Sequence, residues 1–221
     1  MGAGEVRRGP VWKGSALLLL LVCSACAGRR PPAGAPDVPR ADAAFTARFS
    51  GSLEWRGKGV PLSGLLAVVP DSGARLEIRN PLGGVLLVVF VGPRACTLLR
   101  PSDGAQATWG AAGGEFPFAA GDLWFLLSGY PPQESMDTRY RGGVFEARWR
   151  NEGGWVDLAG RASETGPAPF TKARMRGPRG AELRMTLGTP EARTVPEEAL
   201  RPPAPAAETA SPSELLKELV P

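Results

Sequence analysis

Cysteine is the side chain of this sequence with the most distinctive chemistry, because histidine is absent from all 221 residues. The three cysteines are Cys23, Cys26 and Cys96. Without an imidazole, the chain cannot form a Ser-His-Asp triad, a Cys-His dyad or a zinc site with histidine ligands. A metal site made of cysteine alone needs about four thiolates, which three scattered cysteines cannot supply. We therefore expect no metal site.

Two carboxylates, Glu115 and Asp122, are the nearest candidates for acid and base catalysis. Both lie near the start of a predicted helix, where negative charge complements the helix dipole. As a catalytic pair they have no partner motif. We therefore expect no catalytic residues and no enzymatic activity.

Residues 1–25 have the pattern of a secretory leader. Basic residues precede the apolar run 16–22, which is shorter than the roughly 20 residues that span a bilayer. The sequence Cys-Ser-Ala-Cys at 23–26 is similar to a bacterial lipobox, which is cleaved before a lipidated cysteine. We predict lipidation of Cys26; the alternative is an ordinary secretory signal with incidental cysteines. By resemblance to the enteric sorting rule, Ala27 points to the outer membrane.

Processing would leave a mature chain of low charge. The whole chain has a net charge of 26 − 22 = +4, and the leader carries three basic residues and one acid, so 4 − 2 = +2 remains. This dispersed charge gives no indication of nucleic-acid binding. Cys96 would be the one unmodified cysteine, which excludes an intramolecular disulfide, and its apolar context predicts a small buried side chain.

Composition divides the mature chain into three parts. Residues 26–41 are rich in proline and predict a flexible tether from the lipid anchor. Residues 42–188 contain the patterned sequence of one folded domain. Residues 189–221 are rich in proline and alanine and predict a disordered tail, with a short amphipathic helix near its end.

Within residues 42–188 the dominant hydrophobic period is two, which is typical of half-buried strands. Apolar and polar residues alternate over 45–55, 74–79, 145–150 and 181–187. Glycine-rich or proline-containing turn sequences separate these segments. The pattern predicts an antiparallel meander with one apolar face.

Two segments depart from this period. Residues 85–91 are apolar at every position, which predicts a strand covered on both faces. Residues 118–129 place leucines at helical spacing, and Gly129 followed by prolines provides a stop signal. We expect this helix to provide the second cover of the strand at 85–91, lying over a curved sheet with a dry space between them.

Three features together resemble the LolA/LolB superfamily of lipoprotein carriers, and LolB-like outer-membrane receptors in particular. They are the lipobox, the Asn-Pro-Leu-Gly sequence at 80–83 between two strands, and the Leu-Trp-Phe-Leu-Leu-Ser-Gly-Tyr-Pro sequence at 123–131. The resemblance implies a mainly β fold, a half-open antiparallel β-barrel with a helical lid over an apolar cavity. It also implies a membrane-insertion loop formed by Pro81, Leu82 and Gly83, and no cofactor. The alternative for Leu82 is a hairpin turn whose leucine packs against a neighbour.

The inward positions of the expected strands and the lid are the candidate cavity residues. They are Phe49, Leu53, Leu66, Leu76, Ile78, Leu87, Val89, Leu123, Trp124, Leu127, Phe145 and Trp149. Each aromatic residue, including Trp109 and Trp155, could equally be ordinary core. Arg48, Arg75 and Arg79 are expected to be solvated, or to orient the lid from the rim.

The resemblance implies a monomeric protein anchored in the outer membrane and facing the periplasm. Such a protein accepts the acyl chains of lipoproteins from a periplasmic LolA-like carrier and helps to insert them into the membrane. Two other functions remain open: a structural lipoprotein of an envelope complex, and a carrier of another lipid on the same scaffold.

Overall fold

The computed structural model describes residues 38–110, 115–131, 136–204 and 210–217. The predicted leader, the lipidation site at Cys26 and most of the predicted tether lie outside the described residues. Within the described ranges, no helix has the length and apolar character needed to cross a bilayer.

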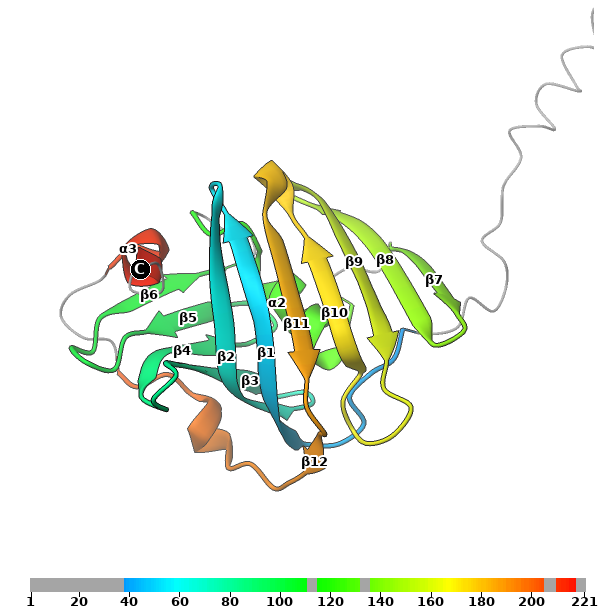
Figure 1. Cartoon of the computed structure of the whole chain (residues 1–221), viewed down its shortest axis with the longest axis horizontal. Coiled ribbons are helices and arrows are strands. Elements are labelled where there is room, and N and C mark those ends of the chain that lie inside the picture. The colour runs from blue at the N-terminus through cyan, green and yellow to red at the C-terminus, as the bar shows by residue number, and fades with distance from the viewer. Residues whose placement is uncertain (1–37, 111–114, 132–135, 205–209, 218–221) are drawn as a thin grey trace, which may run out of the picture. The chain divides into compact units, whose positions relative to one another are not determined.

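The described chain forms one open antiparallel sheet of twelve strands. The order is β6-β5-β4-β3-β2-β1-β11-β10-β9-β8-β7, and β12 pairs with β1 (Figure 1). This confirms the predicted mainly β, half-open fold. The strands are β1 Phe45–Trp55, β2 Lys58–Val69, β3 Gly73–Arg79, β4 Val85–Val91, β5 Cys96–Leu99, β6 Gln106–Trp109, β7 Asp137–Arg141, β8 Val144–Asn151, β9 Gly154–Ala162, β10 Phe170–Arg176, β11 Glu182–Leu187 and β12 Glu191–Ala192. The helices are α2 Ala120–Ser128 and α3 Pro212–Leu216, with short 3-10 helices η1 Pro178–Gly180 and η2 Glu197–Leu200.

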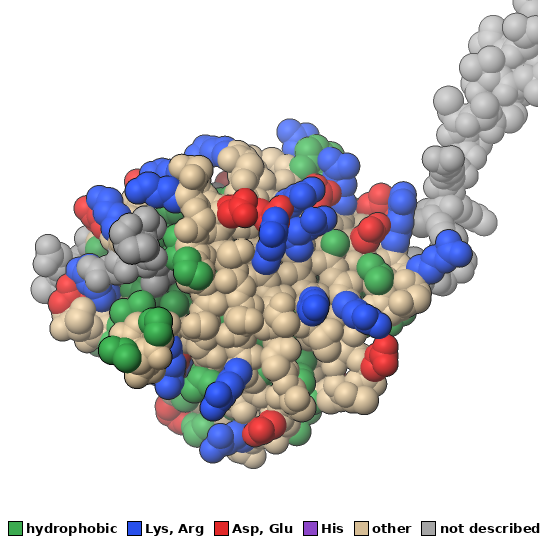
Figure 2. Space-filling view, viewed as in Figure 1, with side chains coloured by type: hydrophobic (Ala, Val, Ile, Leu, Met, Phe, Trp, Pro, Cys, Tyr) green, Lys and Arg blue, Asp and Glu red, His purple; other side chains and the backbone are tan. Residues whose placement is uncertain are grey.

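Alternating side chains give the sheet one apolar and one polar face. In β8, Phe145, Ala147 and Trp149 are buried while the residues between them are exposed. Because successive side chains of a strand point to opposite faces, this alternation directs every second residue into the core. Figure 2 shows the opposite, outward face, on which basic and acidic side chains are interspersed.

The sheet is curved (Figure 1), and neighbouring backbones come unusually close at two glycines of its central strands. A Cβ atom on Gly64 would lie 1.7 Å from the Glu77 carbonyl oxygen, and one on Gly51 would lie 1.9 Å from that of Arg184. Glycine is required at such positions because any side chain would displace the adjacent strand. These two glycines therefore allow the central strands to coil around the core.

Helix α2 lies against the concave face of the sheet, as the sequence predicts. Gly129 ends the helix in the left-handed conformation, with φ of 75°, and its N–H donates to the Phe125 carbonyl. Leu123, Leu126 and Leu127 are all buried. Helix and sheet together enclose the apolar interior of the fold.

The folded unit begins before the predicted boundary at residue 42. Ala41 is buried, and its N–H donates to the Ser128 carbonyl at 2.8 Å. Arg40 lies over the ring of Tyr130, 5.6 Å from its centroid. The last residues of the predicted tether, Val38 to Ala41, therefore pack against the C-terminal end of α2.

The largest difference from the sequence prediction is the C-terminal segment, which is expected to be disordered. Strand β12 pairs with the start of β1, and the Arg193 N–H donates to the Ala44 carbonyl at 3.1 Å. Farther along, Leu200 of η2 and Leu215 of α3 are buried. The proline-rich composition suggests disorder, but the segment is ordered because a few leucines pack on apolar surface of the sheet. Proline also lowers the backbone entropy that is lost on ordering.

Strand β4 is covered on both faces, but α2 is not the cover on the outer one. Val89 and Val91 face the interior, whereas Phe90 faces outward and is nevertheless buried. The Arg75 guanidinium lies 5.8 Å from the centroid of the Phe90 ring and donates to the Ala199 carbonyl in η2. The C-terminal segment and an arginine stem therefore protect the outer face.

Candidate functional site

An apolar cavity lies between the concave face of the sheet and helix α2. Its volume is about 70 Å³, smaller than the roughly 300–1,000 Å³ of typical ligand sites, so a bound acyl chain would have to push the walls apart. Every side chain that lines it is apolar: Phe49, Leu53, Leu62, Leu76, Ile78, Val89, Val91, Leu98, Trp109, Phe116, Leu123, Leu126, Leu127, Leu183, Met185 and Leu216. The indole N–H of Trp109 adds no polar group to the lining, because it donates a hydrogen bond to the Phe118 carbonyl at 3.0 Å.

The structure places part of the predicted cavity set in this lining. The predicted residues that line it are Phe49, Leu53, Leu76, Ile78, Val89, Leu123 and Leu127. They come from β1, β3, β4 and α2. The cavity therefore lies under the half of the sheet that runs from β11 to β6.

The remaining predicted residues are buried away from the cavity. They are Leu66, Leu87, Trp124, Phe145 and Trp149. The Trp149 and Phe125 rings meet edge to face at 5.2 Å, so an α2 side chain packs directly against β8. Trp124 stacks with Tyr130 at 6.5 Å. Direct packing fills this half of the fold, and the hydrophobic period alone does not distinguish filled from unfilled space.

Several lining residues were absent from the predicted set. Leu62, Leu183 and Met185 belong to strands whose alternation identifies them as inward-facing, and Leu126 lies on the lid stripe. The hydrophobic pattern of the sequence therefore already indicates that these four side chains face inward. Leu216 is different, because it comes from a segment without strand or long-helix periodicity.

Asp122 is a buried carboxylate that connects α2 to β8. It is 1% exposed and accepts hydrogen bonds from the Trp149 indole N–H at 2.7 Å and the Asn151 amide at 2.7 Å. It also accepts the Ala119 backbone N–H at 2.8 Å. Burial raises the pKa of Asp122, while these hydrogen bonds oppose the shift. The predicted role in complementing the helix dipole is therefore incomplete, since this side chain also fixes the lid to the sheet.

The predicted insertion loop forms the tip of the β3–β4 hairpin. Leu82 is 95% exposed, and its neighbours Pro81 and Gly83 are exposed as well. Asn80 holds the turn: its carbonyl accepts the Gly83 N–H at 2.9 Å, and its side chain accepts the Gly84 N–H at 2.9 Å. A rigid turn thus presents an apolar side chain to the surroundings, and Leu82 packs against no neighbour.

The remaining residues named in the sequence analysis have contacts or burial that explain their places in the fold. Arg75 and Arg79 both pair with Glu77, at 2.8 Å and 2.5 Å. Trp155 is 53% exposed and lies under Arg148 on the outer face. Cys96 is buried, and burial raises the pKa of its thiol to about 12, which keeps it protonated and unreactive.

No protein-family model and no curated protein sequence matches this chain. Among solved structures it is similar to a LolA superfamily protein from Nitrosomonas europaea, with a TM-score of 0.45 and 8% identity over 76% of this chain and 94% of the other. It is also similar to a domain assigned to outer membrane lipoprotein sorting from Vibrio parahaemolyticus, with a TM-score of 0.47 and 10% identity over 72% and 89% of the two chains. Both TM-scores are below 0.5, so the fold assignment rests on this chain's own strand order and register.

Proposed function

We propose that this protein binds acyl chains in the cavity between its sheet and helix α2. The observation that carries the proposal is the uniformly apolar lining of that cavity. Transfer of an acyl chain from water into such a space is favourable by about 25 cal/mol per Å² of apolar surface buried. Binding of this kind consumes no cofactor.

The finer proposal is a role as an outer-membrane receptor for lipoproteins. In this role the protein is anchored through Cys26, accepts an acylated lipoprotein from a periplasmic LolA-like carrier and passes it to the membrane. The lipobox-like sequence at 23–26 and the exposed tip at Leu82 support the proposal. An apolar side chain on a rigid hairpin can enter the acyl region of a bilayer while the sheet remains outside it.

A cavity-filling substitution tests acyl binding. Val89 lines the cavity from β4, whereas Val85 lies on the same strand and is exposed. In the full chain carrying Cys26→Ala, which prevents the predicted lipidation, Val89→Trp should weaken binding of cis-parinaric acid about tenfold. The matched variant Val85→Trp should bind like the parent. Equal affinity of the parent and the Val89→Trp variant, with unfolding midpoints showing both folded, would contradict the proposal.

A reconstituted transfer assay tests the insertion loop. Leu82→Glu should leave cis-parinaric acid binding unchanged and reduce the delivery of a lipoprotein into phospholipid vesicles, because a charged tip does not enter the bilayer. Leu65→Glu is the control, since Leu65 is a partly exposed leucine elsewhere on the molecule. Delivery at the parental rate by the Leu82→Glu variant would rule out the membrane role of the loop.

A further inference from the structure

The C-terminal segment 210–217 passes from the edge of the sheet to the cavity. The Ala210 N–H donates to the Gln106 carbonyl in edge strand β6 at 2.9 Å. Just before this segment, the Gln106 amide donates to the carbonyls of Pro203 and Ala204, at 3.5 Å and 3.3 Å. The chain is therefore held at β6 immediately before helix α3 begins.

Two adjacent leucines of α3 supply its apolar contacts. Leu215 is fully buried, and Leu216 is 8% exposed and forms part of the cavity wall. Helix α3 packs against β5 and β6. Leu98 and Trp109 of these strands line the same cavity. Leu216 is therefore part of the cavity wall on the β5–β6 side, several strands away in the sheet from the β8 anchor of α2.

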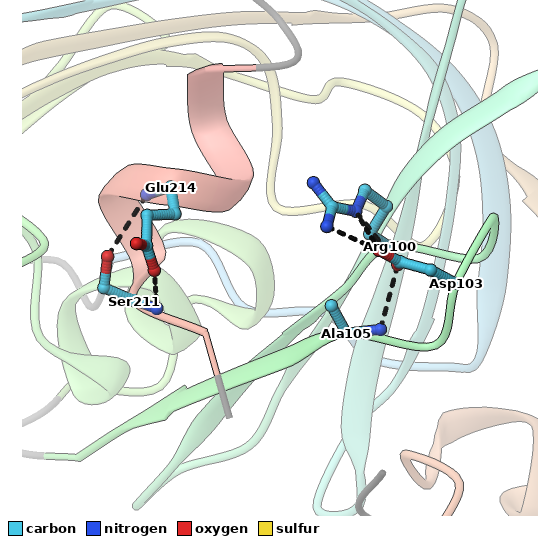
Figure 3. A network of polar contacts seen from close by, with 5 residues as sticks. All are labelled: Arg100, Asp103, Ala105, Ser211 and Glu214. Carbon is cyan, nitrogen blue, oxygen red and sulfur yellow. Dashed lines mark hydrogen bonds and ion pairs between the residues drawn. The ribbon is translucent and has the colours of Figure 1, made fainter. Parts of the chain in front are cut away.

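The polar contacts of α3 are mostly internal and open to solvent. Ser211 and Glu214 cap the helix: the Ser211 N–H donates to the Glu214 carboxylate at 2.8 Å, and the Glu214 N–H donates to the Ser211 hydroxyl at 3.2 Å. Figure 3 shows these contacts beside the turn that carries Arg100 and Asp103. The Ser213 hydroxyl donates to the exposed Glu115 carboxylate at 2.9 Å. Water can replace each of these contacts if the helix leaves.

A helix of five residues is also too short to be stable by itself. Its order depends on the burial of Leu215 and Leu216. An acyl chain in the cavity would compete for the same apolar surface as Leu216, and it would bury more of that surface than one leucine side chain does.

We infer that α3 is an intramolecular plug and that the entry to the acyl-binding cavity lies beneath it, between α3 and strands β5 and β6. The inference rests on the proposed function. In the empty protein Leu216 occupies the entry and keeps the apolar lining from water. A bound acyl chain displaces Leu216, and segment 210–217 then loses its helical structure.

The plug is tested by removing its apolar contact. Leu216→Glu should strengthen binding of cis-parinaric acid by about tenfold, because the affinity of a closed protein is reduced by the fraction of open molecules. A chain that ends after Ala204 keeps the Gln106 amide contacts to Pro203 and Ala204, loses the contact from Ala210, and should show the same gain. The matched control is Lys217→Gln, which changes the charge by the same amount at an exposed neighbouring position.

The outcomes separate the plug from the proposed function. If neither the Leu216→Glu variant nor the shortened chain binds more tightly than the parent, while Val89→Trp still weakens binding, the cavity binds acyl chains and the plug is wrong. Weaker binding by both would show that Leu216 is an ordinary wall of the site, which also overturns the plug. If no variant binds the probe, the proposed function itself fails.

Hydrogen exchange gives a second measurement that does not depend on a variant. Addition of cis-parinaric acid to the parent chain should accelerate amide exchange at Glu214 and Leu215, whose N–H groups donate to the Ser211 carbonyl. Exchange in α2 should slow or remain unchanged. Protection of both helices by the ligand would contradict displacement of α3.

Discussion

The two helices that border the cavity begin with the same device and are held in opposite ways. Each has an acidic residue at its third position that accepts the N–H of the residue before the helix: Asp122 in α2 and Glu214 in α3. Asp122 is buried and also accepts hydrogen bonds from Trp149 and Asn151 of β8. Glu214 is exposed and its capping partner, Ser211, belongs to the same short segment.

This difference shows how one fold can combine a fixed wall with a removable one. A carboxylate that accepts hydrogen bonds from a distant strand makes detachment of α2 costly, because the buried Trp149 indole N–H and the half-buried Asn151 amide would lose their acceptor. Among the described residues, the hydrogen bonds of the α3 cap lie within its own segment, and only the charge of Arg100 reaches Glu214 from the sheet, so detachment of α3 leaves no buried donor without an acceptor. We therefore expect α2 to remain on the sheet while α3 exchanges between bound and released states.

The largest expected effect comes from removing the Asp122 carboxylate. Asp122→Ala leaves the buried Trp149 and Ala119 donors and the half-buried Asn151 amide without their acceptor, and it should lower the free energy of unfolding by about 3 to 5 kcal/mol, measured by urea denaturation. Asp157→Ala is the control, since this exposed carboxylate pairs with Arg148 at 3.3 Å and should contribute less than about 1 kcal/mol. If the two variants lost similar free energies of unfolding, Asp122 would not hold α2 more firmly than an exposed carboxylate does, and the contrast with α3 would fail.

The next effect compares one leucine from each helix. Leu126 and Leu216 line the same cavity and are 2% and 8% exposed. Leu126→Ala should cost about 3 kcal/mol of global stability, whereas Leu216→Ala should cost less than about 1 kcal/mol, because α3 can detach without unfolding the sheet. Urea denaturation of the two variants measures both free-energy losses. Equal losses would mean that α3 unfolds cooperatively with the core.

A smaller effect concerns the cap of α3. Ser211→Ala removes the side-chain acceptor of the Glu214 N–H, a change that costs a helix about 1 kcal/mol. The released state should become more populated, and cis-parinaric acid should bind about fivefold more tightly in a fluorescence titration. Ser63→Ala, at an exposed position on β2, provides the comparison and should leave the affinity unchanged. An unchanged affinity in the Ser211→Ala variant would show that the cap does not control the plug.

The smallest effects concern how stability depends on pH, to which Asp122 and Glu214 should contribute with opposite sign. Burial raises the pKa of Asp122, so its contribution to stability is greatest at low pH and decreases as the pH rises through the folded value. Hydrogen bonds from Ser211, and to a smaller extent the charges of Lys217 and Arg100, lower the pKa of Glu214, so its contribution is present near neutral pH and is lost as the pH falls through the folded value.

Acidification should therefore release α3 before it affects α2. The uncharged probe N-phenyl-1-naphthylamine should bind somewhat more tightly below the folded pKa of Glu214 than at pH 7. In a Glu214→Gln variant the affinity should already be raised and should change less with pH. For α2, the stability difference between the parent and Asp122→Asn should grow as the pH falls, and a difference that shrinks would contradict the assignment.

The strands and the lid could be predicted because each carries its own periodic signal. Phe45, Phe49 and Leu53 repeat at spacings that place them on one face of a strand, and they are all buried in the sheet. Gly129 marks the end of α2 because few other residues adopt its backbone conformation. Information of this kind is local, and local sequence is sufficient to identify it.

The contents of the site could be predicted only in part, because they depend on contacts between distant segments. Asp122 is identifiable as a residue of a helix start, but its bonds to Trp149 and Asn151 join residues 27 and 29 positions away. Phe145 and Phe49 have the same strand pattern, yet only Phe49 lines the cavity. Leu216 lies in a proline-rich tail whose order comes from the surface it meets, and no property of the tail itself reveals that surface.

The central place of β1 in the sheet has a consequence for how the chain acquires its structure. β1 pairs on one side with β2, its neighbour in sequence, and on the other with β11, which is synthesised more than a hundred residues later. During synthesis or export one edge of β1 therefore waits unpaired until the final strands arrive. Folds dominated by such distant pairings form slowly and expose open edges while they do so. We expect completion of the β1–β11 ladder to limit the folding rate and to be the step at which the chain is most open to aggregation.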